Sequence, residues 1–534
     1  MNRGPADGGS LAVRIVRRHD DGPDRWVVAA LLALVSGTLA LSALGPSSLW
    51  RDDAWVALVH RVSFTQALRM GVTAPGFTMA MRTWLWVVGF SELRAQIPAF
   101  LAFVATPPLL YLLALRMRLR WPAALLAATL LATSAPLLEV AGRVKVYSFD
   151  ALAAVVVLWL GWDAAEEPAA PVRWVALAGG ATLLTVMTSS SATAVAGAFL
   201  VALLAAWRAG VHRRGYVVGA VAGYGLFGLV WWRAVVARAS TPSLKISFSG
   251  AMIPGKPGQA RWAGIYARLA DLVGHFTPLA PHHVPFFLVL LAVAVALGTA
   301  RRPELTLLVV TPLAVAVVFA LRRVAPLGGG SVITVNGSRI DVHLYPPLAL
   351  LLAAGFESLL EVAGELRLAH RAAATVSSLA LVAALIATAS SPTYPLEDTK
   401  PLVADVEREA TPADVVIVQT EARYQFALYT HWPRRIVFSR RFETGFTVAT
   451  PQPNVVIMGS GPAEDGHSDS AVFGLVPSPP PPPAPTAPRV FLLTSTFYTS
   501  PKDVEDWLSA GGYVQTADRV LAGAALEVWS RTGG

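Results

Sequence analysis

Long apolar runs dominate this sequence and restrict what it can fold into. A membrane-spanning helix needs about 20 predominantly apolar residues, and its backbone hydrogen bonds must be satisfied within the segment. Charged residues make up only 14% of the 534-residue chain and hydrophobic residues 54%, which excludes a water-soluble multidomain enzyme. The sequence therefore predicts a mainly α-helical, polytopic membrane protein. Eleven spans are expected, near residues 26–44, 95–115, 122–140, 148–163, 173–188, 192–208, 216–236, 284–300, 304–321, 346–362 and 372–390.

The first run, 26–44, has two interpretations because a polar, arginine-containing segment, 1–25, precedes it. It can be the core of a cleaved signal peptide or an uncleaved first helix. Signal-peptide cores usually hold only about 7–15 apolar residues. The longer run here favours an uncleaved first helix.

Arginine clusters in the short linkers predict the orientation of the bundle. They lie at Arg116–Arg120, Arg208–Arg214 and Arg301–Arg302. Cytoplasmic loops carry an excess of Lys and Arg, so all three linkers and the segment 1–25 are expected inside the cell, and the C-terminus outside. The formal net charge of +9 is explained by these linkers, which disfavours nucleic-acid binding.

One further apolar segment, 77–90, is short and contains Arg82. If this segment spanned the membrane, the Arg116–Arg120 linker would lie outside the cell. We therefore expect an interfacial helix in the first outer loop. On this topology the multi-pass bundle occupies residues 26–391 of a plasma-membrane protein. Its outer loops are 46–94, 237–283 and 322–345.

The tail, 392–534, differs in composition and predicts an extracytoplasmic α/β domain. Helix-like runs cover 398–410 and 501–510, the second opened by Ser500 and Pro501. A proline-rich stretch at 477–488 predicts a stiff polyproline II loop. The chain holds no cysteine, which excludes disulfides and cysteine-metal sites. Short β-type runs occur at 414–419, 435–439, 454–458, 489–494 and 526–529.

Charged residues at the expected outer membrane border are the first indication of function. Asp52 and Asp53 follow the first span at an expected helix start, where carboxylates also cap helices and favour the helix dipole. Arg143, Tyr147 and Asp150 have the spacing of one helical face, together with Glu139. The alternative is a self-neutralising stripe with snorkelling cations. Against this alternative, Asp150 lies at the mouth of an apolar span, where a carboxylate is energetically costly and usually functional.

Two later segments carry further candidates. Arg339 and His343 enter the tenth span with the spacing of one helical face, although an isolated histidine is more often packed and hydrogen-bonded than a ligand. Lys256 and Arg261 lie among aromatic residues in the long outer loop, which suits an anionic headgroup, a sugar or ordinary interfacial anchoring. In the same loop, His282 and His283 are adjacent and would point apart on a helix or strand, so no metal site is predicted from them.

Together these residues favour a reaction on a lipid-linked phosphosugar. Fixed cations would neutralise a departing lipid phosphate, and a carboxylate would accept the proton of an attacking hydroxyl. A nucleotide-sugar donor is not favoured, because the sequence shows no glycine-rich phosphate loop.

At these residues the sequence resembles the GT-C superfamily of integral-membrane glycosyltransferases, most of all its family 39-like group of bacterial polyprenyl-phosphate-sugar transferases. Asp52-Asp53-Ala54 is similar to the group's Asp-Glu-Ala motif, with Asp53 in place of Glu. Residues 145–150 (KVYSFD) match its Lys-x-Tyr-Ser-x-Asp motif, and 337–339 (GSR) match its late Gly-x-Arg segment. The chain departs from the group at 73–76 (TAPG), where His-Pro-Pro is usual, and at 142–144 (GRV), which lacks the usual Glu.

The resemblance implies sugar transfer from a polyprenyl-phosphate donor to a cell-envelope glycan, lipid or protein, with inversion at the anomeric carbon. It makes Asp52 the expected base and Asp53 a second candidate. Lys145, Tyr147 and Arg339 become ligands of the donor phosphate, and Asp150 an orienting or acceptor-binding carboxylate. The superfamily varies in its need for a divalent metal ion, and no metal ligands are predicted here. The Ala- and Arg-rich composition is typical of a high-GC actinobacterium, whose carrier would be decaprenyl phosphate.

Two other classes of function compete with this prediction. A transporter or flippase for a lipid-linked sugar would place broken helices and charges near the bilayer midplane, often in two related halves. The charges here lie at the border, and no internal repeat is evident. A non-catalytic scaffold of the cell envelope would suit the polyproline stretch and the outer domain, but it would not require Asp52.

Overall fold

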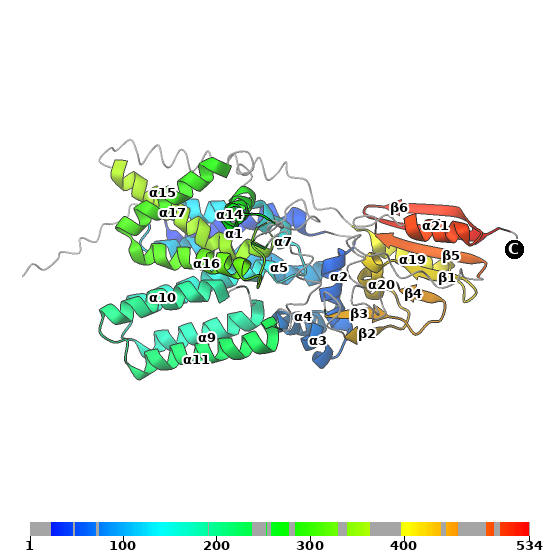
Figure 1. The fold of residues 1–534 in the computed structure, drawn as a ribbon, viewed down its shortest axis with the longest axis horizontal. Coiled ribbons are helices and arrows are strands. Elements are labelled where there is room, and N and C mark those ends of the chain that lie inside the picture. Colours follow the sequence, from blue (N-terminus) through cyan, green and yellow to red (C-terminus); the bar gives the residue numbers. More distant parts are fainter. Residues whose placement is uncertain are drawn as a thin grey trace, which may run out of the picture.

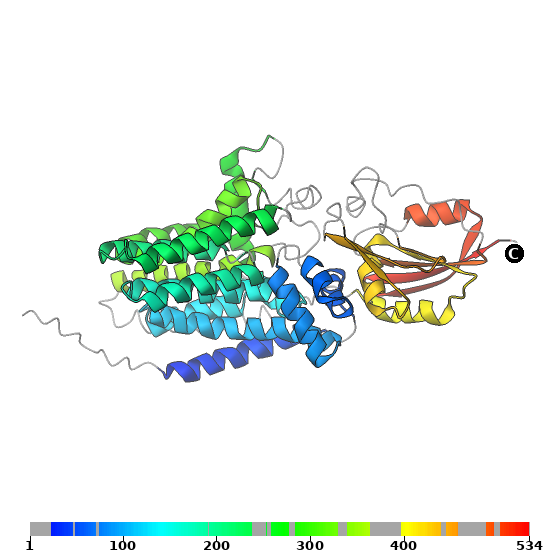
Figure 2. The same ribbon diagram turned by 90° about the horizontal axis from the view of Figure 1, so that it is seen from below.

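The protein is elongated, with a helix bundle at one end and an α/β region at the other (Figure 1). This computed structural model describes residues 23–45, 48–70, 74–188, 190, 192–237, 252–253, 258–276, 284–328, 339–363, 397–438, 445–457, 487–495 and 502–532. Helices of the first loop lie between the bundle and the α/β region, and they bring the two ends into contact (Figures 1 and 2).

Helices occupy ten of the eleven predicted runs, and the run near 372–390 lies outside the described residues. Small residues let the helices approach closely, as where Gly161 of α8 meets Ala198 of α10. The bundle consists of α1 (Arg25–Ala40), α5 (Glu92–Arg116), α6 (Trp121–Ala132), α7 (Ala135–Ala141), α8 (Tyr147–Glu166), α9 (Pro171–Thr188), α10 (Ala192–Arg208), α11 (Gly215–Trp231), α15 (Val284–Arg301), α16 (Pro303–Leu321) and α17 (Tyr345–Ala363).

Several of these helices have the length and composition of membrane spans. Among the described residues five helices qualify, or six if α6 and α7, which are bent by 58°, form one broken span. The longest, α5, runs for 25 residues with a mean hydropathy of 1.9 in its apolar window. This supports a membrane protein, while the count of eleven spans stays a prediction.

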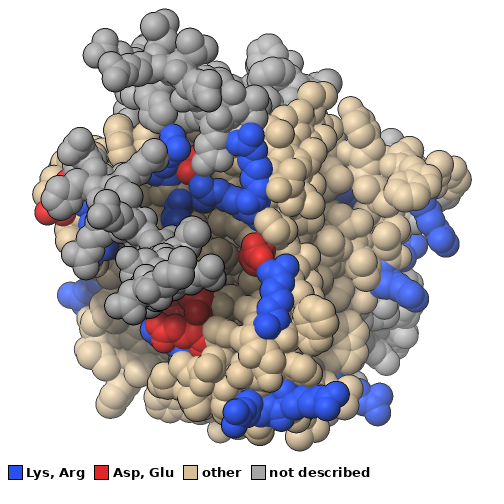
Figure 3. Space-filling model, turned by 90° about the vertical axis from the view of Figure 1, so that its left-hand side faces the viewer, with Lys and Arg blue, Asp and Glu red and all other residues tan. Residues whose placement is uncertain are grey.

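The arginine-rich linkers meet at the end of the bundle that faces away from the α/β region. The Arg302 guanidinium donates to the Arg118 carbonyl at 3.1 Å, and Arg208 pairs with Glu304 at the start of α16. Lys and Arg side chains gather on this face of the molecule (Figure 3). The three clusters therefore share one end, as the predicted orientation requires.

The first loop folds into four short helices: α2 (Arg51–Ala57), the 3-10 helix η2 (Leu58–Arg61), α3 (Phe64–Met70) and α4 (Pro75–Val88). The expected interfacial helix at 77–90 corresponds to α4. Arg82, the charge within it, donates from Nε to the Val62 carbonyl at 2.9 Å and lies over the Phe64 ring. This arginine therefore ties α4 to the end of η2.

The C-terminal residues form a five-stranded mixed sheet in the order β4-β1-β5-β7-β6, in which β1 is parallel to β4 and β5. Helices α19 and α21 cover opposite faces (Figure 2). The elements are α19 (Thr399–Glu409), β1 (Val415–Val418), η7 (Thr420–Ala422), α20 (Arg423–Tyr429), β2 (Arg435–Phe438), β3 (Phe446–Ala449), β4 (Val455–Ile457), β5 (Arg489–Ser495), α21 (Lys502–Ala510), β6 (Tyr513–Leu521) and β7 (Ala524–Arg531).

All five predicted strands and both predicted helices of this region are present. The short α20 and the strands β3 and β6 were not predicted. Ser500, Pro501 and most of the proline-rich stretch, 477–486, lie outside the described residues.

The α/β region and the first loop share one hydrophobic core. Leu58 of η2 and Met81 of α4 belong to the same buried cluster as Val403 of α19 and Phe426 of α20. Trp55 of α2 meets the ring of Phe446 edge-on, with 6.0 Å between centroids. The two parts of the sequence therefore pack as one body, which fixes α2 against α20 and β3.

Candidate functional site

The candidate site forms where the start of α2 meets the turn between α7 and α8. Asp52 and Asp53 lie in the first turn of α2, where the helix dipole favours negative charge. The facing turn carries Arg143 and Lys145. It comes close to the first span at Gly142, where a Cβ atom would lie only 1.9 Å from the carbonyl oxygen of Ala43.

Asp53 is buried and held from two sides. The Arg143 guanidinium pairs with its Oδ2 at 2.9 Å, and the Val144 N–H donates to its Oδ1 at 3.0 Å. Burial raises the pKa of Asp53 above its ordinary value, against the opposing effect of the Arg143 and Lys145 charges. With both oxygens engaged, Asp53 joins the turn to α2.

Asp52 has a more open environment. Its side chain is 22% exposed, against 2% for Asp53. The Lys145 ammonium lies 3.9 Å from its Oδ2 and 3.8 Å from the centre of the Trp55 ring. A partly exposed carboxylate therefore stands beside a cation held by an aromatic ring. That arrangement can accept a proton and bind an anion side by side.

Residues of the α/β region hold the start of α2 in place. Arg51 pairs through Nη1 with Glu421 at 3.1 Å, and its N–H donates to Oε2 of Glu397 at 2.9 Å. Ser495, at the end of β5, donates to the other oxygen of Glu397 at 2.7 Å, and Gln425 also donates to this carboxyl. Burial raises the pKa of Glu397 to about 7.

The expected helical stripe from Glu139 to Asp150 is not formed. Helix α7 ends at Ala141 and α8 begins at Tyr147, so the turn between them interrupts the predicted face. Asp150 is buried in the first turn of α8, near the hydroxyl groups of Thr188 and Ser190. Tyr147 is half-buried at the start of the same helix. The predicted residues are therefore divided between α7, the turn and α8.

The late segment forms a 3-10 helix, η6 (Arg339–Leu344). Residues three apart, not four apart, share one face of a 3-10 helix. The positions of Arg339 and His343 therefore do not lie on one face, as the sequence had predicted for an α-helix. The Arg339 side chain lies outside the described residues. His343 is buried, its Nδ1 is 3.2 Å from the Ile340 carbonyl, and burial lowers its pKa to about 4. This favours the packed, neutral histidine over a ligand.

The candidates of the long loop are not part of the site as the structure describes it. Lys256 and the pair His282-His283 lie outside the described residues. Arg261 is exposed at the first residue of α14 (Arg261–Phe276). Within the described ranges, His, Asp and Glu side chains form no group of three or more that could hold a metal ion.

Sequence reasoning missed the contribution of the α/β region to this site. Glu421 lies just beyond the carboxyl end of β1, and Ser495 is the last residue of the parallel strand β5. Glu397 lies just before α19. The rule that ligands and functional groups gather at the carboxyl edge of parallel strands could have indicated the first two. No local pattern marks Glu397.

No protein-family model matches this sequence, and no curated protein matches it either. A solved structure does: ArnT from Cupriavidus metallidurans bound to undecaprenyl phosphate. The TM-score is 0.52 at 14% identity, and the match covers 94% of this chain and 98% of that one. The chain therefore has a fold similar to that of ArnT, while its assignment to the GT-C superfamily stays a prediction. The narrower family 39-like assignment stays a prediction.

Proposed function

We propose that this chain is a membrane glycosyltransferase that moves a sugar from a polyprenyl-phosphate donor to a cell-envelope acceptor. Its likeness to an ArnT structure that holds undecaprenyl phosphate supports a lipid-phosphate donor. The reaction would take place on the extracytoplasmic face, at the end of the bundle opposite the arginine-rich linkers.

One observation carries the proposal: Asp52 is the partly exposed carboxylate of the pair, and it lies beside Lys145. In the proposed mechanism Asp52 accepts the proton of the acceptor hydroxyl as that oxygen attacks the anomeric carbon. The bond from that carbon to the phosphate oxygen breaks, and the configuration is inverted. Lys145 stabilises the charge that develops on the departing phosphate. Asp53 and Arg143 keep α2 and the turn in register.

The test compares purified wild type and Asp52→Asn on a panel of synthetic polyprenyl-phosphate sugars. We expect product from at least one donor, and a loss of about 10²–10⁴-fold in the variant, the usual contribution of a general base. Donor binding should change little. The matched control is Asp506→Asn, which alters an exposed carboxylate on α21. An Asp52→Asn enzyme with wild-type turnover would refute the role of Asp52.

A further inference from the structure

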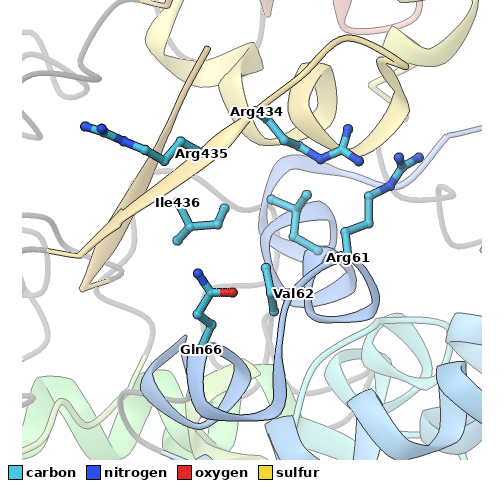
Figure 4. A pocket seen from close by; sticks show the side chains of 7 residues that line it. Arg61, Val62, Gln66, Arg434, Arg435 and Ile436 are labelled. Atoms are coloured by element: carbon cyan, nitrogen blue, oxygen red, sulfur yellow. The ribbon is translucent and has the colours of Figure 1, made fainter. Parts of the chain in front are cut away.

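A second cationic feature lies between the first loop and the α/β region. A cavity of about 160 Å³ is lined by Arg61, Val62 and Gln66 from η2, α3 and the residues joining them, and by Arg434, Arg435 and Ile436 from the start of β2 (Figure 4). None of the residues assigned above to the catalytic site lines it. The cavity is smaller than the roughly 300–1,000 Å³ of sites that enclose drug-sized ligands, so it suits one small charged group.

Two arginines face one another across this cavity. The side chains of Arg61 and Arg434 extend toward each other, whereas Arg435 extends away on the other side of Ile436 (Figure 4). Arg434 donates from Nη1 to the Thr430 carbonyl at 2.8 Å, which fixes its direction. Like charges brought together repel one another unless an anion lies between them.

The nearest compensating carboxylate is already engaged. The oxygens of Glu407 accept hydrogen bonds from the Thr430 hydroxyl at 2.6 Å and from the ring and N–H of His431 at 2.9 and 2.6 Å. Among the described residues, no carboxylate lies within 4.0 Å of the Arg61 or Arg434 guanidinium. Burial lowers the pKa of Arg434 to about 10, and the charge of Arg61 adds to this effect.

The remaining lining groups suit an esterified anion. The Ser63 N–H donates to Oε1 of Gln66 at 3.1 Å, which orients the amide so that its NH₂ group, a donor, is on the other side. Val62 and Ile436 supply an apolar wall. Guanidinium groups match the oxygens of a phosphate better than any other side chain does, because their N–H donors are fixed in one plane.

We propose that this cavity binds one phosphate group, clamped between Arg61 and Arg434, and that the bound anion links the first loop to the α/β region. The phosphate can belong to a lipid headgroup or to a soluble phosphate compound. The proposal does not depend on the transferase function.

The experiment titrates the full chain in non-ionic detergent with inorganic phosphate, using calorimetry. The variants are Arg61→Gln, Arg434→Gln and the double variant. Arg531→Gln, which removes an exposed charge from the end of β7, is the control. Each single variant should weaken phosphate binding at least tenfold, since each removes charge-assisted hydrogen bonds. Arg434→Lys, which keeps the charge, should weaken it less. Phosphate bound at the proposed donor site contributes equally to all samples, so the difference between them reports this cavity.

A second arm distinguishes the sources of the phosphate. The titration is repeated in phosphatidylcholine nanodiscs with and without phosphatidylglycerol. A lipid headgroup in the cavity would lower the apparent phosphate affinity of the wild type and leave the double variant unaffected. A soluble source predicts the same affinity in both kinds of disc. Phosphate binding that is equal in wild type and double variant, or absent from both, would overturn the proposal, provided that thermal melts show both to be folded.

Discussion

Asp52 and Asp53 are adjacent in the sequence and have the same chemistry, yet their surroundings differ. The α2 helix turns Asp53 toward Arg143 and the Val144 N–H, where it is 2% exposed. Asp52 lies on another side of the same turn with 22% exposure and one cation at 3.9 Å. A buried, doubly bound carboxylate stabilises the fold, while a partly exposed one can exchange protons with a substrate.

This difference predicts opposite results for two alanine variants. Asp53→Ala should destabilise the protein by about 3–5 kcal/mol, because it breaks a buried ion pair by removing the carboxylate that faces Arg143. Asp52→Ala should cost under about 1 kcal/mol, since the pair with Lys145 is long and partly exposed. Thermal unfolding of both purified variants in the same detergent measures this. Equal melting shifts would contradict the separate roles.

Gly142 makes a prediction of steric origin. A Cβ atom there would lie 1.9 Å from the Ala43 carbonyl oxygen, so Gly142→Ala must displace the turn that carries Arg143 and Lys145. We expect a loss of about 1–3 kcal/mol together with lower transfer activity. Gly219→Ala is the control, because a Cβ atom at that helical position meets nothing within 4 Å. The same melts and transfer assay compare the two, and an unchanged Gly142→Ala protein would show that the turn can move freely.

Among single residues, the sequence could predict the carboxylate pair and the basic turn but not their pairing. The spacing of Glu139, Arg143 and Asp150 predicted one helix because nothing local shows how close Gly142 comes to Ala43. Which of the two aspartates is exposed depends on Arg143, which lies far along the chain. The motifs and the predicted topology therefore identified the candidate residues, whereas tertiary packing determines the environment of each one.

At the scale of elements, burial separates what could be predicted from what could not. Apolar runs predicted the helices of the bundle because lipid and the helix core both select apolar side chains. The side chains of β1 and β5 alternate between the two buried faces of the sheet, and both strands were predicted. Strand β6 was missed because most of its residues are exposed and its polar and apolar side chains do not alternate regularly. It is held by pairing with β7, a contact made between strands.

The docking of α2 on the α/β region predicts a pH dependence. Burial raises the pKa of Glu397 from 4.5 to about 7, so the folded protein binds its proton more tightly than the unfolded chain does. The stabilisation is therefore fully present below pH 4.5 and is lost as the pH rises to about 7. A shift of this size corresponds to roughly 3 kcal/mol.

Glu397→Gln tests this, since an amide imitates the protonated carboxyl. The wild type should lose more stability than Glu397→Gln between pH 5 and pH 8, which thermal melts across that range would show. Proteolytic release of the α/β region should follow the same trend in wild type. Parallel melting curves for the two proteins would exclude Glu397 as the source of the pH dependence.

At the scale of the whole molecule, the α/β region contributes to the candidate site rather than forming a separate appendage. Its glutamates hold Arg51, its helices share a core with the first loop, and its strands end toward α2. The sequence predicted this region as a domain of its own because its composition differs from that of the bundle. The shared core depends on contacts between residues more than 300 positions apart, such as the hydrogen bond from the Ser48 hydroxyl to Asp398, which no local pattern can reveal.

The orientation of the molecule makes the last prediction. The arginine-rich linkers lie at one end and the proposed catalytic site at the other, so the positive-inside rule predicts that the site lies outside the cytoplasm. Because the sequence holds no cysteine, single introduced cysteines are unique labels. Ser509→Cys on α21 should react with a membrane-impermeant maleimide in intact cells. Arg213→Cys, in a linker at the opposite end, should react only after the cells are permeabilised. Both positions are exposed, so access to the reagent and not burial decides the labelling. The reverse pattern would place the site in the cytoplasm and exclude a donor presented on the outer face.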